Sequence, residues 1–598
     1  MNKKHKFHIP VLGIGYSIDT PLKVAKYGIS SVVSLVDDSL LEKMREYYSK
    51  KTNKEFNEID PKDNDARAKR VTAYLNMLNT MVNEQLDELK KMKFNAENDL
   101  AKYFEMLPDF SDLKKKYREL LTTVDGVSFE KLQAWLKENI SLGSIDVNIM
   151  TKLDKTNRTK SGEVLSNEYN DAHAALRGFA ESDLEGSVIF SAGMNPRLYS
   201  YAEKFNDFYP DLAGNIRKKI VLKVSDFRSA LIQGKFLAKK GLWVSEYRIE
   251  SGLNCGGHAF ATDGFLLGPI LEEFKSKKTE LINMVKNLLD QALTKKGIRY
   301  NGEKLGLNIT VQGGVGTESE HHFLQRYYGM DSVGWGTPFM LVPEIMNVDE
   351  NTLEKLSKAE EKDLYLSGAS PLGVPFNNLR GSEQELEKIE RLKNGRPGSP
   401  CTKKFLISNT EYSDKPQCTA SISYVTKKIN ELKDKYEINT DFKKEFDKVV
   451  EKACLCVGLG ASTHKVNKLD PKKLSKAVSV CPGPNMAYFS KKASLFEMVD
   501  HIYGRANLIT KKERPNIFIK ELGLYFDYLV NKVKESENPL AGIKTKYLEE
   551  FKNNMLDGIN YYKSLLPNLE EESQKIKERM EKELADFEAK LLSLSISL

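Results

Sequence analysis

The segment SGLNCGGHAF, residues 251–260, places a histidine directly after two glycines at the end of a β-rich run. Glycine has no Cβ and accepts backbone dihedrals that other residues refuse, so this turn brings backbone and an imidazole close to a flat ligand. With an ordinary pKa of about 6.5, His258 could take up a proton or hold an oxyanion. The alternative is a structural hydrogen-bonding histidine. Cys255 is either a small buried residue or a second reactive group.

Two further glycine-rich turns follow, in QGGVGTESEHH and GWGTPF. Backbone N–H groups at such turns bind phosphate, together with the N-terminus of the helix that follows. The residues expected to contribute are Gln312, Gly313, Gly314, Gly316, Gly336 and Thr337. The alternative is that these glycines only permit tight turns. No G-x-G-x-x-G opens a helix, so dinucleotide binding of the Rossmann type fits less well.

Five of the six cysteines fall in the C-terminal part of the chain, in turn-like contexts such as GSPC, ACLC and VCPGP. Iron–sulfur clusters are bound by thiolates that converge from loops, although the usual C-x₂-C arrays are absent here. The candidate ligands are Cys401, Cys418, Cys454, Cys456 and Cys481. Zinc ligands and inert buried thiols remain alternatives. His321 and His322 are adjacent on an expected helix and point in different directions, which disfavours a metal site there.

Short β-rich runs alternate with helical stretches over the first 345 residues, a pattern typical of parallel strands joined by helices. The candidate strands are 9–14, 30–36, 145–151, 187–191, 219–224, 242–249, 307–312 and 332–335. The sequence therefore predicts an α/β fold, a (β/α)₈ TIM barrel formed by residues 1–37 and 141–345.

The remaining residues form two additions to this barrel. Residues 38–140 carry an apolar stripe at helical spacing that includes Val71, Leu75 and Leu78, which predicts a helical insertion between strands 2 and 3. It either packs on the barrel or another subunit, or acts as a lid over the strand ends. Residues 346–598 are expected to be mostly helical, with cysteine-bearing loops.

The composition restricts the classes of partner. The net charge of +7 is spread through a lysine-rich chain, without the basic stripes and interleaved aromatics that indicate nucleic-acid binding. No stretch approaches the roughly 20 apolar residues that cross a bilayer. The N-terminal apolar run is short and broken by Pro10, so no export signal is expected. We expect a cytoplasmic protein with thiols in the reduced state.

Taken in order, these motifs resemble the nitronate monooxygenase family, formerly called 2-nitropropane dioxygenases, which includes flavin-dependent enoyl-acyl carrier protein reductases. The resemblance covers residues 9 to about 344. Asn148 matches an asparagine in the third strand, SAGMNP from Ser191 matches the turn after the fourth, and Gly256, Gly257 and His258 match the most diagnostic turn. GGV and GWGTPF match the family's phosphate loops.

The resemblance implies an FMN-dependent oxidoreductase that acts on a small carbon acid, nitronate or activated alkene. His258 would transfer a proton, and the flavin ring would lie across the barrel mouth near Gly13, Gly15 and Tyr16. The electron donor would be NAD(P)H or a ferredoxin-like protein, and a homo-oligomer is one expected state.

Two departures from the family pattern bear on the reaction more than on the cofactor. Asn254 and Cys255 stand where the family usually has Glu-Ala, and Phe260 replaces a common glycine. The C-terminal 250 residues have no counterpart in ordinary members. The alternative function is therefore a non-catalytic sensor or assembly protein that binds a flavin or another phosphate ligand and carries an iron–sulfur cluster.

Overall fold

The computed structural model describes residues 4–95, 97–123, 126–159, 161–191, 193–254, 263–437, 440–472, 474–510, 513–536 and 543–596. Eight parallel strands form a closed barrel in chain order. They are β1 (Phe7–Ile9), β2 (Ser30–Ser34), β3 (Ile145–Met150), β4 (Gly186–Ser191), β5 (Lys218–Val224), β6 (Val244–Glu250), β7 (Asn308–Gln312) and β8 (Ser332–Gly334). The (β/α)₈ barrel predicted from the sequence is confirmed.

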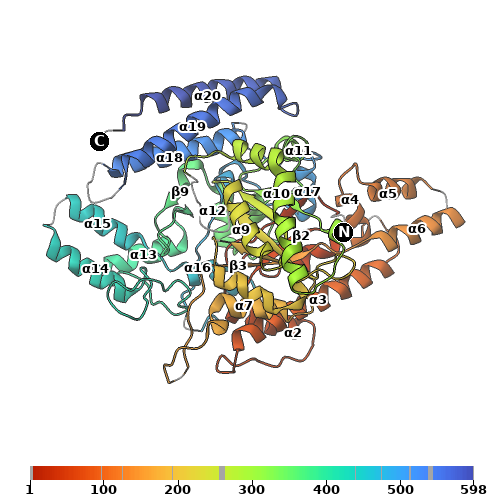
Figure 1. The fold of residues 1–598 in the computed structure, drawn as a ribbon, viewed down its shortest axis with the longest axis horizontal. Helices are drawn as coiled ribbons and strands as arrows, with labels where there is room; N and C mark the ends of the chain where they lie inside the picture. Colours follow the sequence, from red (N-terminus) through yellow and green to blue (C-terminus); the bar gives the residue numbers. More distant parts are fainter. Residues whose placement is uncertain are drawn as a thin grey trace.

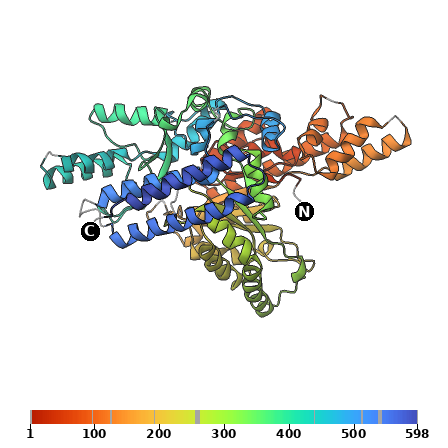
Figure 2. The ribbon, with the colours of Figure 1, turned by 90° about the horizontal axis from the view of Figure 1, so that it is seen from above.

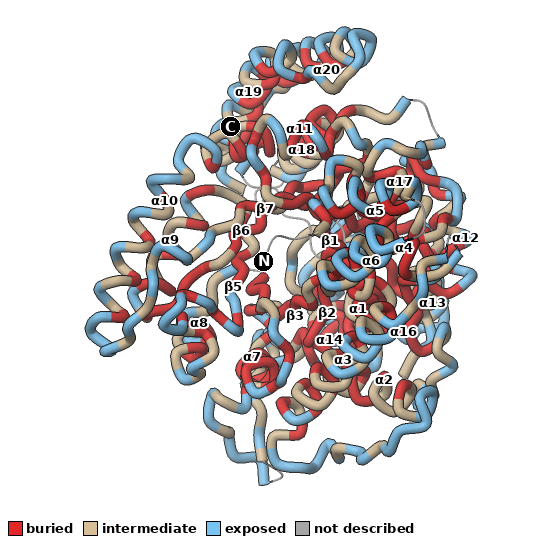
Figure 3. The backbone as a smooth tube through the Cα atoms, turned by 90° about the vertical axis from the view of Figure 1, so that its right-hand side faces the viewer, coloured by how far each residue is buried: buried red, intermediate tan, exposed pale blue. Residues whose placement is uncertain are grey.

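Seven of the eight predicted strands agree with the structure to within two residues at each end. The prediction for the first strand, residues 9–14, was wrong in position. This strand ends at Ile9, and residues 11–14 are turn and irregular backbone. Pro10 has no N–H to donate to a neighbouring strand, which favours an end to the ladder at this point. The strands are largely buried, as Figure 3 shows by colour.

Helices surround the barrel and bury its outer face. Those between the strands are α1 (Thr20–Val24), α7 (Asp171–Ala180), α8 (Pro196–Tyr201), α9 (Phe227–Ala238), α10 (Leu267–Lys295) and α11 (Glu318–Arg326). Side-chain caps define several of their starts: Asp226 accepts a hydrogen bond from the Ser229 N–H, and Thr317 accepts one from Glu320.

The insertion between β2 and β3 is helical, as predicted. It contains α2 (Asp38–Lys51), α3 (Ala66–Lys91), α4 (Asp99–Met106), α5 (Asp112–Thr122) and α6 (Val127–Asn139). The apolar stripe of α3 is buried and packs against α2 and α7. Figure 2 shows the orange segment, which includes α5 and α6, extending away from the barrel.

The chain after the barrel is mostly helical, also as predicted. It contains α12 (Glu350–Lys358), a hairpin of β9 (Leu364–Ser367) and β10 (Phe376–Leu379), α13 (Glu383–Lys393), α14 (Ile422–Lys435), α15 (Thr440–Glu451), α16 (Leu455–Val466), α17 (Leu495–Ile502), α18 (Ile517–Ser536), α19 (Thr545–Leu565) and α20 (Gln574–Ser593). The last three helices pack together, and α18 and α19 also contact α10 (Figure 1). None of the described helices is long and apolar enough to span a membrane.

Candidate functional site

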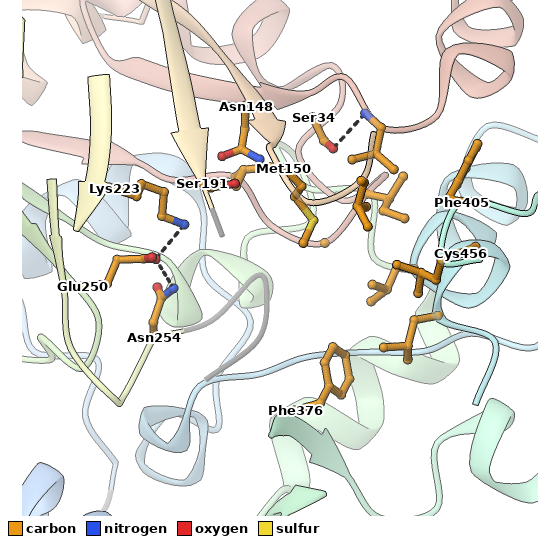
Figure 4. Close-up of a pocket in the computed structure, with 18 residues that line it drawn as sticks. Ser34, Asn148, Met150, Ser191, Lys223, Glu250, Asn254, Phe376, Phe405 and Cys456 are labelled. Carbon is orange, nitrogen blue, oxygen red and sulfur yellow. Dashed lines mark hydrogen bonds and ion pairs between the residues drawn. The ribbon is translucent and has the colours of Figure 1, made fainter. Parts of the chain in front are cut away.

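A cavity of about 800 Å³ lies at the carboxyl ends of the barrel strands. Its barrel wall consists of Val11, Gly13, Ile14, Ser34, Val36, Asn148, Met150, Leu153, Ser191, Lys223, Glu250 and Asn254. Its second wall, from the C-terminal region, consists of Phe376, Phe405, Leu406, Leu455, Cys456 and Leu459. Figure 4 shows Lys223 and Glu250 across the cavity from Phe405 and Cys456. No described residue of 38–140 lines this cavity.

Glu250 organises the polar part of the barrel wall. The Lys223 ammonium lies 2.6 Å from Glu250 Oε1. The same oxygen accepts hydrogen bonds from the side-chain amides of Asn254, at 2.5 Å, and Gln312, at 2.9 Å. These groups come from the ends of β5, β6 and β7, so one carboxylate fixes the side chains of neighbouring strands (Figure 4).

Two buried amide oxygens near this wall have no partner among the described residues: Asn148 Oδ1 and Gln312 Oε1. A buried polar atom without a hydrogen bond costs about 1–3 kcal/mol, so such atoms call for an explanation. Asn148 lines the cavity directly. A ligand that presents N–H groups to this wall would donate hydrogen bonds to these oxygens.

The apolar wall is held onto the barrel by polar contacts. Lys403 lies 2.5 Å from Asp37, and both side chains are less than a tenth exposed. Burial acts to raise the pKa of Asp37, but the Lys403 ammonium holds it below its usual range. The Asn377 amide, beside Phe376, donates to the Asn254 carbonyl at 2.9 Å. The C-terminal region is therefore fixed at the mouth of the barrel.

A second cavity of about 250 Å³ lies between the loops that follow β7 and β8. It is lined by Pro10, Asn254, Gly313, Gly314, Val315, Gly334, Gly336, Thr337, Pro338 and Asn485. Four of the predicted phosphate-binding residues thus meet here: Gly313, Gly314, Gly336 and Thr337. Asn254 lines both cavities, so the two adjoin.

The glycines of the first loop also have a local structural role. Gly313 and Gly314 have φ values of +106° and +88°, which other residues rarely adopt. A Cβ on Gly314 would lie 2.6 Å from Leu253 Cδ1. Gly316 differs from the other two, because its N–H donates to Glu320 Oε2 at 2.9 Å and is not available to a phosphate.

Residues far along the chain support this loop from behind. The Arg514 guanidinium donates to both Glu320 oxygens, at 2.7 and 2.8 Å, and to the Gly314 carbonyl at 2.8 Å. The Asn485 amide donates to the carbonyls of Gly314 and Val315. Sequence analysis missed both Asn485 and Arg514, since nothing in their local sequence marks them.

The residues predicted to lie near a flavin ring after β1 divide into two groups. Gly13 lines the main cavity. Gly15 and Tyr16 contact the C-terminal region, with the Gly15 N–H donating to the Leu459 carbonyl at 3.1 Å and the Tyr16 hydroxyl donating to the Ser479 carbonyl at 2.5 Å. Their contact with a cofactor stays a prediction.

Cys255, Gly256, Gly257 and His258 lie outside the described residues. The structure describes both flanks of their segment. Glu521, on α18, accepts hydrogen bonds from the backbone N–H of Gly252 at 3.2 Å and of Leu267 at 2.7 Å. Burial raises the pKa of Glu521 to about 7. One carboxyl group from the C-terminal region therefore holds both ends of the segment that contains His258.

Four of the five C-terminal cysteines line a third cavity, of about 220 Å³: Cys401, Cys418, Cys454 and Cys456. Cys481 is buried but does not line it. Within the described part of the chain, no group of three or more His, Cys, Asp or Glu residues could hold a metal ion. His321 and His501 have structural partners, Trp335 Nε1 and the Gly316 carbonyl.

No protein-family model and no curated protein sequence matches the chain. Remote likenesses exist among solved structures. The enoyl reductase domain of MlnA, from the macrolactin biosynthesis cluster of Bacillus amyloliquefaciens, is 13% identical, with 76% of this chain and 89% of that chain covered and a TM-score of 0.33. FabK from Thermotoga maritima is 14% identical, with coverages of 66% and 88% and a TM-score of 0.30.

A third likeness is to nitroalkane oxidase from Streptomyces ansochromogenes. It is 9% identical, with 83% of this chain and 95% of that chain covered and a TM-score of 0.33. These likenesses are too distant to carry an argument about function, which has to come from the site itself.

Proposed function

We propose that this chain is an FMN-dependent oxidoreductase, similar in type to nitronate monooxygenases, that acts on a small carbon acid, nitronate or activated alkene. The observation that supports this most strongly is the pair of adjoining cavities at the carboxyl ends of the strands. The larger one combines apolar side chains with a few polar groups, as small-molecule sites do, and the smaller one lies between the two loops where TIM barrels commonly bind phosphate.

The residues of both cavities fit a flavin nucleotide. A flat heteroaromatic ring needs apolar contact on its faces and hydrogen bonds at its edge, and the unpartnered Asn148 Oδ1 lies on the wall of the larger cavity. Backbone N–H groups of Gly313, Gly314 and Gly336 would hold the phosphate in the smaller one. When bound, the flavin would supply the electron chemistry, and the protein would supply binding and orientation.

His258 remains our candidate for proton transfer. Asn254, which lies four positions before His258 in the sequence, lines both cavities. On either side of this segment, the backbone N–H groups of Gly252 and Leu267 donate to the Glu521 carboxyl. Cys255 is adjacent to Asn254 and is the second candidate.

The apolar wall supports a substrate with a hydrophobic part. Phe376, Phe405 and Leu455 face the cavity from the C-terminal region, where they would exclude water from a bound substrate. A nitronate or activated alkene with a hydrocarbon chain fits such a wall better than a fully polar substrate does. NAD(P)H or a ferredoxin-like protein is our proposed electron donor.

A visible spectrum of freshly purified protein under anaerobic conditions tests the cofactor. We expect the absorbance of a bound flavin, its bleaching by dithionite, and release of FMN on denaturation. Chromatography of the released compound distinguishes FMN from FAD. A colourless protein that cannot be reconstituted with FMN would remove the proposed function.

A substitution at His258 tests the proton-transfer role separately. With NAD(P)H and with a chemical reductant, His258→Asn should keep its flavin and its rate of flavin reduction. Its turnover with nitronates or activated alkenes should fall by about 10²–10⁴-fold, the range for loss of a general acid or base. Full turnover in His258→Asn would exclude this residue as the proton-transfer group.

A further inference from the structure

A side cavity of about 260 Å³ adjoins the main cavity where β2 and β3 end. Val36, Met150, Leu153 and Phe405 line both cavities, so these four side chains form the boundary between them. Figure 4 shows Met150 and Phe405 among the side chains around the main cavity. A ligand in the main cavity would enter the side cavity by passing these side chains.

The side chains that line only the side cavity are mostly apolar. Leu35 follows β2, Ile149 lies in β3, and Ala172 and Ala175 lie on α7. All four are buried, at 3% exposed or less. Ala172 and Ala175 are three residues apart and therefore share one face of the helix. Their short side chains leave room that longer side chains would fill.

Two charged residues, Arg67 and Asp171, also line the side cavity, and both have partners within the protein. The Arg67 guanidinium donates to Asp38 Oδ1 at 2.7 Å and to three backbone carbonyl groups at 2.8–3.1 Å. The Asp171 carboxylate accepts from the Asn157 amide at 2.9 Å and lies 3.4 Å from the Lys155 ammonium. An apolar occupant would therefore leave these two charges with their partners.

This lining determines what the side cavity can bind. A buried water makes about three hydrogen bonds to polar groups, so apolar cavities suit hydrocarbon better than water. We propose that the side cavity binds the end of an unbranched hydrocarbon chain of the substrate, while the reacting group lies in the main cavity beside the polar barrel wall. The inference rests on the proposed function, and it narrows the substrate class to nitronates or activated alkenes with an unbranched alkyl chain.

Met150 and Phe405, on the boundary, would select the chains that can pass. Methionine is unbranched and flexible, so Met150 can adjust to a narrow chain. The Phe405 ring is held more firmly, because its centroid lies 5.8 Å from the carbon of the Arg67 guanidinium, within range of a cation–π interaction. A linear chain would need a change in Met150 alone, whereas a branched chain would also displace Phe405.

Isothermal titration of the full-length protein with neutral nitroalkanes tests the side cavity without turnover. The probes are nitroethane, 1-nitropropane, 1-nitrobutane and 1-nitrohexane. Affinity should rise by about fourfold for each methylene group that is buried. The values of kcat/KM for the corresponding nitronates should rise in parallel.

Substitutions on α7 separate the side cavity from the main one. Ala175→Leu and Ala172→Val fill the side cavity from positions that do not line the main cavity. Each should lower the ratio of 1-nitrohexane affinity to nitroethane affinity by about tenfold, the equivalent of nearly two methylene groups. Ala174→Val is the matched control, because Ala174 is 1% exposed on the same helix and lines neither cavity. It should keep the wild-type ratio.

Circular dichroism and urea denaturation report folding in each variant. A crystal structure of the wild-type protein with 1-nitrohexane locates the chain directly, so the test remains decisive if a filled variant fails to fold. We expect the end of the chain between Phe405 and Ala175. A chain that stays within the main cavity would overturn the inference.

The remaining outcomes separate this inference from the proposed function. Equal affinity ratios in Ala175→Leu, Ala172→Val and Ala174→Val would remove the side cavity as a binding site, and so would the absence of any binding. Turnover without dependence on chain length would keep the proposed function and exclude the side cavity. Binding that depends on chain length and on Ala175, without turnover, would support the side cavity and argue against the proposed function.

Discussion

The two walls of the main cavity differ in chemistry and in origin. The barrel wall presents an ammonium, a carboxylate and side-chain amides, fixed around Glu250. The wall from the C-terminal region presents phenylalanine and leucine side chains. Among the described residues, the hydrogen-bonding groups that could meet the polar edge of a ligand therefore lie mainly on the barrel side, while the other side is largely apolar. We therefore expect the barrel wall to orient a bound ligand and the wall from the C-terminal region to select among substrates by size.

The C-terminal region has a second role on the polar side. Arg514, Asn485 and Glu521 all contact backbone of the loops after β6 and β7. The barrel wall is therefore supported from behind by the region that also closes the cavity in front. We therefore expect substitutions in these three supporting residues to affect stability and flavin binding more than substitutions in the apolar wall do.

Among these substitutions, we expect Arg514→Met to lower the stability of the protein most. Arg514 and Glu320 are 6% and 2% exposed, and loss of the guanidinium would leave a buried carboxylate without its partner. We expect a loss of about 3–5 kcal/mol in the free energy of unfolding, measured by urea denaturation. FMN affinity, measured by fluorescence titration, should fall as the Gly314 loop loses its support.

Lys358→Met is the matched control, because its pairing with Glu354 is solvent-exposed at 72% and 57%. Such pairs contribute about 0–1 kcal/mol, so stability and FMN affinity should hardly change. If both variants behaved alike, the supporting role of the C-terminal region would be wrong.

Glu521→Gln should change how stability depends on pH. The folded protein raises the pKa of Glu521 to about 7, from an ordinary value of 4.5. Between these values the folded state binds a proton that the unfolded state has released, so this group lowers stability as pH rises toward 7 and has no further effect above it. The change is about 3 kcal/mol, at about 1.4 kcal/mol per pKa unit.

Urea denaturation at pH 5 and pH 8 measures how the free energy of unfolding depends on pH. Glutamine does not titrate, so the stability of Glu521→Gln relative to wild type should rise between the two pH values. At pH 5 the variant should be less stable than wild type by about 1 kcal/mol, because one of the two backbone N–H groups that donate to Glu521 loses its acceptor. The exposed Glu549→Gln serves as control, and an equal pH dependence in both variants would contradict the assignment.

Gly314→Ala tests the phosphate loop itself. Alanine at φ +88° is strained, and its Cβ would press on Leu253 at 2.6 Å. Gly329→Ala is the matched control. Gly329 has a φ of +67° and no atom within 4 Å of an added Cβ, so alanine there would be strained in the backbone but would not be crowded. We expect Gly314→Ala to be less stable than Gly329→Ala by about 2 kcal/mol, the cost of overpacking. Only Gly314→Ala should lose FMN, and loss from both would implicate general destabilisation.

The barrel could be predicted because its strands are short, apolar and bounded by turn residues. In β3, for example, Ile145, Val147 and Ile149 alternate with polar residues, a pattern typical of a strand. The glycine pairs that follow β7 and β8 likewise mark sharp turns, and they meet around one cavity. Local sequence carries enough information for such features, because each depends on neighbours in the chain.

The C-terminal half of the site could not be predicted for the opposite reason. Arg514 and Glu320 are 194 residues apart, and nothing in the local sequence of Arg514 indicates that it pairs with Glu320. Phe405 follows a segment rich in glycine and proline, which predicts only irregular structure. The convergence of four cysteines depends on how loops fold back on α16, and their spacing alone does not define it.

The smallest expected effect is that of Phe405→Leu, in the apolar wall. Leucine is smaller than phenylalanine and keeps the wall apolar, so stability should fall by only about 1 kcal/mol. FMN affinity should stay within about threefold of wild type, because the wall does not contact the polar edge of the ligand. The added space should favour substrates with a bulkier apolar part. This preference is measured as the ratio of kcat/KM for two substrates of different size.

Phe110→Leu is the control, because the Phe110 side chain is 60% exposed, and it should leave that ratio unchanged. A large loss of FMN in Phe405→Leu would show that the apolar wall also binds the cofactor, and that the division between the two walls is incorrect.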